Sequence, residues 1–200
     1  MKTEQIVVTS QGQGIAEALS ITEKAGAYAG LDKKPALHLR LLAEELIGLL
    51  RGIAGEVEAA YWIETEGKKF ELHMTSEILM TEEMREQFLA AASSGKNAAT
   101  ATFMGKIRVM IADALLSAKE VLPYAMINAA AANPMGGVAG ESSAVWTMAF
   151  YKEELQQNMA DEEASEAWDE LEKSIVANVA DDVRVSIAGK NVAITVYKAF

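Results

Sequence analysis

The stretch HLRLLAEELIGLLRGIAG, residues 38–55, carries the clearest helical pattern in the chain. Its large aliphatic side chains recur every three or four residues, the spacing that places them on one face of an α-helix. This face consists of Leu39, Leu42, Leu46, Leu49 and Ile53. We therefore predict a helix over about residues 35–54 that buries the stripe against the rest of the molecule.

One acidic side chain of this helix, Glu45, lies beside the apolar stripe, four residues after Leu41 and four before Leu49. A carboxylate in such a position costs free energy unless it is hydrogen-bonded. Glu45 therefore either reaches solvent at the boundary of the stripe, or it has a partner or a chemical role. The neighbouring Glu44 follows Arg40 by four residues, and we expect these two to pair on the outer face.

The remaining patterns follow the order strand, two helices, hairpin, helices, hairpin. The strands are expected at residues 5–10, in a hairpin over 58–76 that turns at Glu66-Gly67-Lys68, and in a hairpin over 181–200 that turns at Gly189-Lys190-Asn191. Besides 35–54, helices are expected at 15–29, 81–92, 104–122 and 160–180, the last with Trp168, Leu171 and Ile175 on one face. This order predicts an α+β fold, a two-layer sandwich of a mixed, largely antiparallel sheet with helices on one face.

No linker divides the chain, so we expect a single domain over residues 1–200 with an elaboration at about 120–175. Within the elaboration, residues 123–140 are typical of a loop, and 143–155 fit a strand, a helix or a passage from one to the other. Its aromatic side chains are candidates for partner binding, for dimerisation or for ordinary core packing. They are Trp146, Phe150, Tyr151 and Trp168.

The net charge of −11 makes nucleic acid and anionic membrane surfaces poor partners, because like charges repel. A basic protein partner is compatible with this charge. The chain has no cysteine, which excludes disulfide and thiolate chemistry. Its amino terminus lacks the apolar core of a signal peptide, so the expected compartment is the cytoplasm.

Familiar catalytic and metal-binding motifs are absent from the sequence. Two histidines and no cysteine leave little material for a transition-metal site, so no metal site is expected. The two Gly-Lys pairs, at 95–96 and 105–106, lack the earlier glycine and the following Ser or Thr of a phosphate loop. The acidic cluster at 161–170 lacks the glycine-punctuated loop of a calcium site, and we interpret it as a solvated helix face.

The segment AGAYAGLDKKPALHLRLLAEELIGLL, residues 25–50, resembles the first two helices of the anti-sigma regulatory factor serine kinases. These bacterial proteins belong to the wider group of histidine-kinase-like (GHKL) ATPases. The order of the later elements also fits, from the hairpin at 58–76 through the helix that begins at Met104-Gly105-Lys106 to the terminal hairpin. The resemblance covers about residues 5–118 and 176–200, and it does not extend to 120–175.

The resemblance assigns Glu45 the role of the base that activates the attacking water or hydroxyl. The family places an asparagine four residues later, where it supplies an oxygen to magnesium on ATP, but this chain has Leu49 there. The family's Asp-x-Gly-x-Gly adenine motif also has no counterpart, because no glycine occurs between Gly67 and Gly95. Each polar contact to a charged group is worth about 1.5–3 kcal/mol, so these departures together predict that nucleotide binding is lost or weakened.

The leading hypothesis is therefore a regulatory domain that resembles an anti-sigma factor and acts by binding a protein. The partner would be a sigma factor, an antagonist of an anti-sigma factor, or a second copy of the chain in a homodimer. The alternative is a divergent serine/threonine kinase with Glu45 as base and with ATP and magnesium as cofactors. Its phosphate ligands would be Gly95, Lys96, Asn97, Gly105 and Lys106. A third hypothesis is a pocket between sheet and helices that binds another small ligand.

Overall fold

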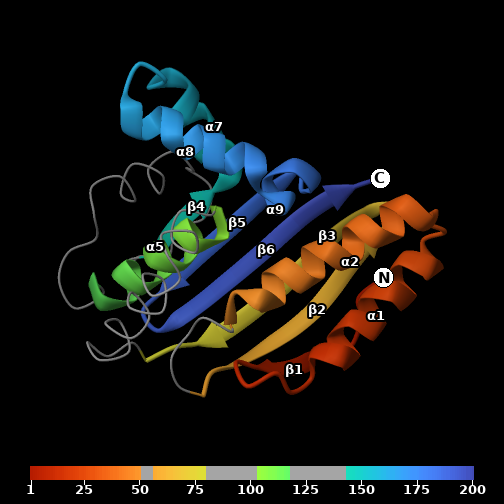
Figure 1. The fold of residues 1–200 in the computed structure, drawn as a ribbon. Helices are drawn as coiled ribbons and strands as arrows, with labels where there is room; N and C mark the ends of the chain where they lie inside the picture. Colours follow the sequence, from red (N-terminus) through yellow and green to blue (C-terminus); the bar gives the residue numbers. More distant parts are fainter. Residues whose placement is uncertain (51–55, 80–102, 118–142) are drawn as a thin grey trace.

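The computed structural model of the protein describes residues 1–50, 56–79, 103–117 and 143–200 (Figure 1). The described elements, in chain order, are β1 (Ile6–Thr9), α1 (Ile15–Tyr28), α2 (Lys33–Gly48), β2 (Glu58–Glu66), β3 (Lys69–Glu77), α5 (Phe103–Ser117), β4 (Ser143–Thr147), α7 (Met148–Gln157), α8 (Glu162–Lys173), α9 (Ile175–Val179), β5 (Asp182–Ala188) and β6 (Asn191–Ala199). The helix expected at 81–92, the stretch 93–102 and the loop expected at 123–140 lie outside the described residues.

The strands form one six-stranded sheet in the order β1-β2-β3-β6-β5-β4, and every described pair of neighbours is antiparallel. Figure 1 shows α1, α2 and α5 lying across one face of this sheet, with α7 and α8 projecting beyond it at the β4–β5 side. The predicted two-layer α+β class is confirmed. The expected mixed sheet is wrong for the described strands, because each connection between them returns the chain in the opposite direction.

The sheet owes its two unlike faces to strands that alternate buried and partly exposed residues. On β2, Tyr61 and Ile63 are fully buried against the helices, whereas Trp62 and Glu64 lie on the opposite face. Both hairpins turn through two residues, led by Gly67 at φ 60° and Gly189 at φ 56°. This left-handed backbone is the conformation that tight hairpin turns demand, so both predicted turns are confirmed.

The first two helices pack on the β1–β3 side of the sheet through an aliphatic stripe and one polar contact. Leu39, Leu42 and Leu46 of α2 are at most 1% exposed, which confirms the predicted face. Beneath α1, the Thr22 hydroxyl lies 2.8 Å from the Tyr61 hydroxyl, and both side chains are buried. Because a buried hydroxyl without a partner is costly, this hydrogen bond fixes how α1 sits on β2.

Two predicted helices end differently from expectation. The helix predicted at 35–54 begins two residues earlier and is α-helical only to Gly48, and residues 51–55 lie outside the described part. The helix predicted at 160–180 is broken at Ser174, whose hydroxyl accepts a hydrogen bond from the Ala177 amide and caps α9. Ile175 is consequently 45% exposed and does not share the buried face of Leu171, so that part of the prediction is wrong.

Residues 143–155, for which the sequence allowed a strand, a helix or a passage between them, form a strand that leads directly into a helix. Thr147 is the last residue of β4, and its hydroxyl accepts a hydrogen bond from the Phe150 amide as the N-cap of α7. The expected pair of Arg40 and Glu44 is also present, with Nε and Oε1 2.9 Å apart. Arg40 additionally reaches Glu23 of α1, so it links the two helices.

Candidate functional site

The candidate site lies where the end of α2 faces α5 over strands β3 and β6. Arg108 of α5 donates from Nη2 to the Gly48 carbonyl oxygen, 2.5 Å away. The last carbonyls of a helix have no partner within the helix, so this guanidinium caps α2 from a neighbouring element. The chain then continues through Leu49 and Leu50, which are 3% and 2% exposed.

A small, largely apolar cavity of about 30 Å³ lies between these elements. Its polar lining side chains are those of Ser76 and Arg108, and the rest are aliphatic or methionine side chains from β3, α5, β6 and the residues that directly follow α2 and β3. Pockets for drug-sized ligands have volumes of about 300–1,000 Å³, while one water needs about 10–15 Å³. The space bounded by these residues therefore suits a water molecule and is far too small for a nucleotide.

Arg108 is the least expected member of this site. Burial lowers the pKa of its guanidinium, and the nearby negative charge of Glu45 opposes that shift. Its buried Nε has no hydrogen-bond partner among the described residues. Glu45, whose side chain is partly exposed, thus has a charge partner on α5. The sequence analysis did not single out Arg108, although a lone arginine within the apolar run IRVMIADALL was a signal that would have marked it.

The structure brings together only part of the predicted site. Glu45 of α2 faces Arg108, and Gly105 is buried in the first turn of α5. Lys106 belongs to the same turn, but its side chain lies outside the described part, as do the whole residues Gly95, Lys96 and Asn97. Leu49, which the resemblance aligns with a magnesium ligand, lines the cavity and is buried in the core.

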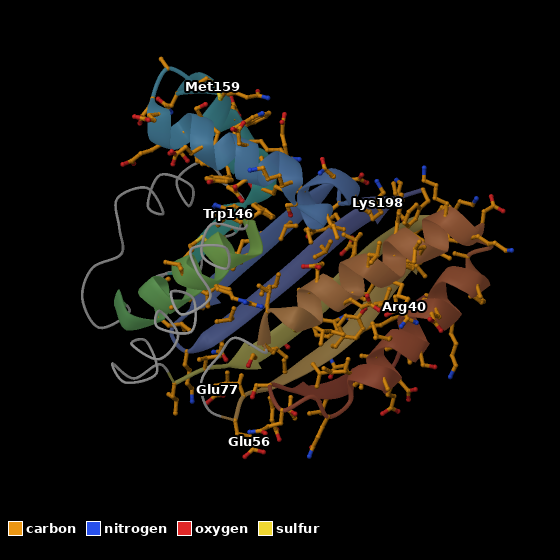
Figure 2. All side chains as sticks on the ribbon, viewed as in Figure 1. Arg40, Glu56, Glu77, Trp146, Met159 and Lys198 are labelled. Atoms are coloured by element: carbon orange, nitrogen blue, oxygen red, sulfur yellow. The ribbon has the colours of Figure 1, made fainter. Side chains whose placement is uncertain are left out.

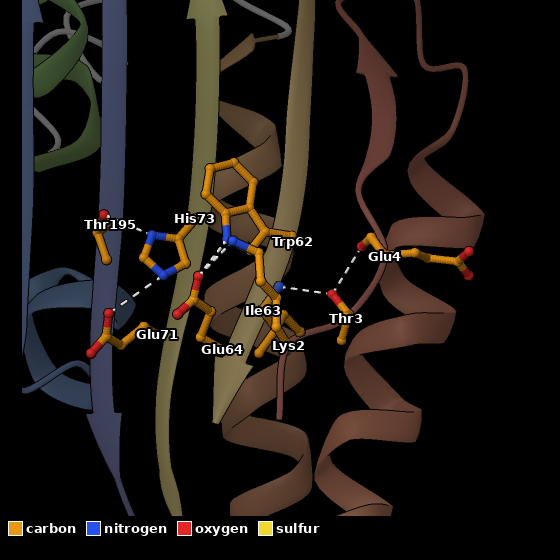
Figure 3. A network of polar contacts seen from close by, with 9 residues as sticks. All are labelled: Lys2, Thr3, Glu4, Trp62, Ile63, Glu64, Glu71, His73 and Thr195. Carbon is orange, nitrogen blue, oxygen red and sulfur yellow. Dashed lines mark hydrogen bonds and ion pairs between the residues drawn. The ribbon is translucent and has the colours of Figure 1, made fainter. Parts of the chain in front are cut away.

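A second cluster of polar side chains lies on the sheet face opposite the helices (Figure 3). His73 stacks on Trp62 with ring centroids 4.9 Å apart, and its Nδ1 lies 3.2 Å from the Thr195 hydroxyl. The Trp62 indole donates to Glu64, which also pairs with Lys2 at 2.9 Å. These contacts join the amino terminus to β2, β3 and β6 along one row of the sheet.

His73 packs within this cluster of polar side chains. Its Nε2 is buried and lies 3.4 Å from Glu71 Oε2 without forming a hydrogen bond. Burial lowers the pKa of the imidazole, whereas the charges of Glu64 and Glu71 oppose that shift. The described residues include no group of three or more His, Asp or Glu side chains arranged to hold a metal ion.

The aromatic side chains of the elaboration divide into packed and exposed ones. Trp146 and Tyr151 pack with Phe103 of α5, with ring centroids 5.8–6.4 Å apart. Trp168 is also packed against the core, and its indole donates to Glu172. Phe150, in contrast, is 43% exposed. Core packing therefore accounts for three of the four aromatic candidates.

No family model, curated protein or solved structure matches this chain. Within the part of the chain that the structure describes, no helix has the length and apolar character needed to cross a membrane.

Proposed function

We propose that this chain is a regulatory domain that acts by binding a protein partner, on a scaffold of the histidine-kinase-like ATPase type whose nucleotide site is lost or weakened. The observation that carries the proposal is the burial of Leu49, which is 3% exposed in the core at the position of the magnesium ligand in that family. A leucine side chain has no donor oxygen for a hard cation such as Mg²⁺.

The surroundings of Leu49 support the same proposal. The adjacent cavity of about 30 Å³, as the described residues bound it, has no room for a nucleotide, and its lining is apolar except for Ser76 and Arg108. Arg108 donates a hydrogen bond to the Gly48 carbonyl oxygen and so links α5 to the end of α2. This end of α2 thus serves packing. The proposed partner is a sigma factor, an antagonist of an anti-sigma factor or a second copy of the chain, and the proposed setting is the bacterial cytoplasm.

The second candidate function, an ATP-dependent serine/threonine kinase, is favoured by Glu45 alone. Its carboxylate is partly exposed, and in this candidate it takes the role that the resemblance implies, as the base for a hydroxyl at the surface of α2. This candidate requires a magnesium ligand from elsewhere in the chain, because Leu49 cannot supply one.

Calorimetric titration of the protein with ATP and magnesium, with Glu45→Ala in parallel, separates the two candidates. We expect no binding heat for either protein up to millimolar ATP. Micromolar binding that requires magnesium and weakens in the Glu45→Ala variant would contradict the proposal and establish a working nucleotide site.

A further inference from the structure

The α7–α8 unit, residues 148–173, concentrates the negative charge of the protein. It contains nine acidic residues and two lysines, whereas the whole chain has a net charge of −11. Figures 1 and 2 show that this unit projects from the sandwich, with Met159 at its outer tip. Phe150 and Met159 are 43% and 44% exposed, so the unit also presents apolar surface to solvent.

A groove of about 550 Å³ runs between α7 and α8. Its apolar lining includes Leu155, Ala164 and Ala167, which are 6–8% exposed. Its acidic lining comes from both helices and from the segment between them. These acidic residues are Glu154, Asp161, Glu163, Glu166 and Glu170. The groove thus has an apolar floor of small side chains and carboxylates along its edges.

Most of these carboxylates have no cation beside them within the described residues. Glu170 pairs with Lys173 at 2.9 Å, and that lysine is 68% exposed. The other lysine of the unit, Lys152, donates to the Ala177 carbonyl of α9 and is therefore directed away from the groove. Asp161 serves locally as the N-cap of α8. Like charges crowded along one groove repel each other, and a cationic partner would relieve that repulsion.

We propose that the groove between α7 and α8 is a docking site for a basic amphipathic helix of a partner protein. The apolar stripe of such a helix fits the floor formed by Leu155, Ala164 and Ala167, and its lysines or arginines meet the carboxylates on both sides. The alanines allow a helix backbone to approach closely. This inference deepens the proposed function, since it rests on protein binding and names the surface and the chemistry of the partner.

A defined peptide tests the site. The probe is a fluorescein-labelled helix of leucine and lysine, about 18 residues long, with leucine on one stripe and lysine on both sides of it. We expect saturable binding by fluorescence anisotropy that weakens as salt is raised. Replacing three groove carboxylates in the variant Glu163→Gln/Glu166→Gln/Glu170→Gln should weaken binding roughly tenfold, about 1.4 kcal/mol.

The matched control also removes three carboxylates, one from α7 and two from α8, at positions that do not line the groove. This variant, Glu153→Gln/Glu162→Gln/Asp169→Asn, should bind the peptide within about twofold of the unchanged protein, because charges at the rim of an interface contribute little to affinity. A peptide of identical composition with its leucines scrambled around the helix should bind at least roughly tenfold more weakly, because it lacks the apolar stripe.

Three results would overturn the docking site: no binding of the amphipathic peptide, equal weakening by both triple variants, or equal binding of the scrambled peptide. The last two would show that only the general negative charge attracts the peptide. These failures are distinguishable from a failure of the proposed function, because ATP binding is measured separately, by calorimetry on the unchanged protein.

Discussion

Two helical pairs of this protein, α1–α2 and α7–α8, use their surfaces in opposite ways. The first pair lies over β1, β2 and β3, and its apolar stripe ends in Leu49 and Leu50 within the core. The second pair projects from the sandwich and keeps a groove with uncompensated carboxylates along it. The comparison is the basis of both proposals: the end of α2 is taken up by core packing, and the α7–α8 pair carries the proposed docking surface.

The largest loss of stability is expected from Gly14→Ala at the start of α1. Gly14 has φ 72°, and an added Cβ would lie 1.9 Å from the Val7 carbonyl oxygen, so the backbone must shift. We expect a loss of about 2–4 kcal/mol in the free energy of unfolding, from overpacking and left-handed strain together. Urea denaturation checks this value, with Gly67→Ala as the control. Gly67 also has a left-handed backbone, at φ 60°, but an added Cβ there meets no other atom, so this variant should lose only about 1 kcal/mol. Equal losses for both variants would contradict the close packing of α1 on β1.

The next loss of stability is expected at Leu49, at the end of the packed pair α1–α2. The variant Leu49→Asn introduces the amide that the proposed resemblance calls for, but it places that amide in a core position that is 3% exposed. We expect a loss of about 2–4 kcal/mol of stability and no gain of magnesium-dependent ATP binding. Leu37→Asn on the same helix is the matched control: Leu37 is 54% exposed, and its replacement should change stability by less than about 0.5 kcal/mol. A stable Leu49→Asn protein that binds ATP would show that the site needs only this one ligand.

A smaller effect is expected beneath α1. Thr22→Val removes the partner of the buried Tyr61 hydroxyl and should cost about 1–3 kcal/mol. The double variant Thr22→Val/Tyr61→Phe removes both hydroxyls and should recover part of that loss, which thermal and urea unfolding can measure. A loss of unfolding free energy in the double variant that exceeds the sum of the losses in the two single variants would contradict a hydrogen bond between these hydroxyls that holds α1 in place.

The smallest expected effect concerns His73 on the open sheet face. Because burial lowers the pKa of this imidazole in the folded protein, the unfolded chain binds a proton first as the pH falls. Stability should therefore decrease as the pH falls below about 6.5, the ordinary pKa of histidine. His73→Gln should flatten this part of the curve of unfolding free energy against pH. An unchanged curve would mean that His73 does not titrate differently in the two states.

Much of the sandwich could be predicted from the sequence because its signals are local. The hairpins follow from alternation around Gly67 and Gly189, and α2 follows from the spacing of its leucines. The break at Ser174 was missed because the helical spacing of Trp168, Leu171 and Ile175 continues across it, whereas the Ser174 hydroxyl caps the start of α9. Local pattern also did not reveal the role of Arg108, since its contact with Gly48 joins positions 60 residues apart.

The groove between α7 and α8 could not be predicted from the sequence for a related reason. The acidic residues were visible as a cluster, and we interpreted them as a solvated helix face. Whether carboxylates from two helices line one concave surface depends on how the helices pack, which the spacing along a single helix does not determine. Tyr151 illustrates the point, because it packs with Phe103 and also lines the groove.

The most direct test of the account is one NMR experiment on the isotope-labelled protein, which records backbone amide shifts with magnesium and ATP and then with the leucine–lysine helix. We expect no shift changes at Glu45, Leu49 or Arg108 with nucleotide, and peptide-induced changes confined to the α7–α8 groove, residues 151–170. Nucleotide-dependent shifts around Glu45 and Arg108, with none in α7 or α8 on adding the peptide, would contradict the assignment of packing to one helical pair and binding to the other.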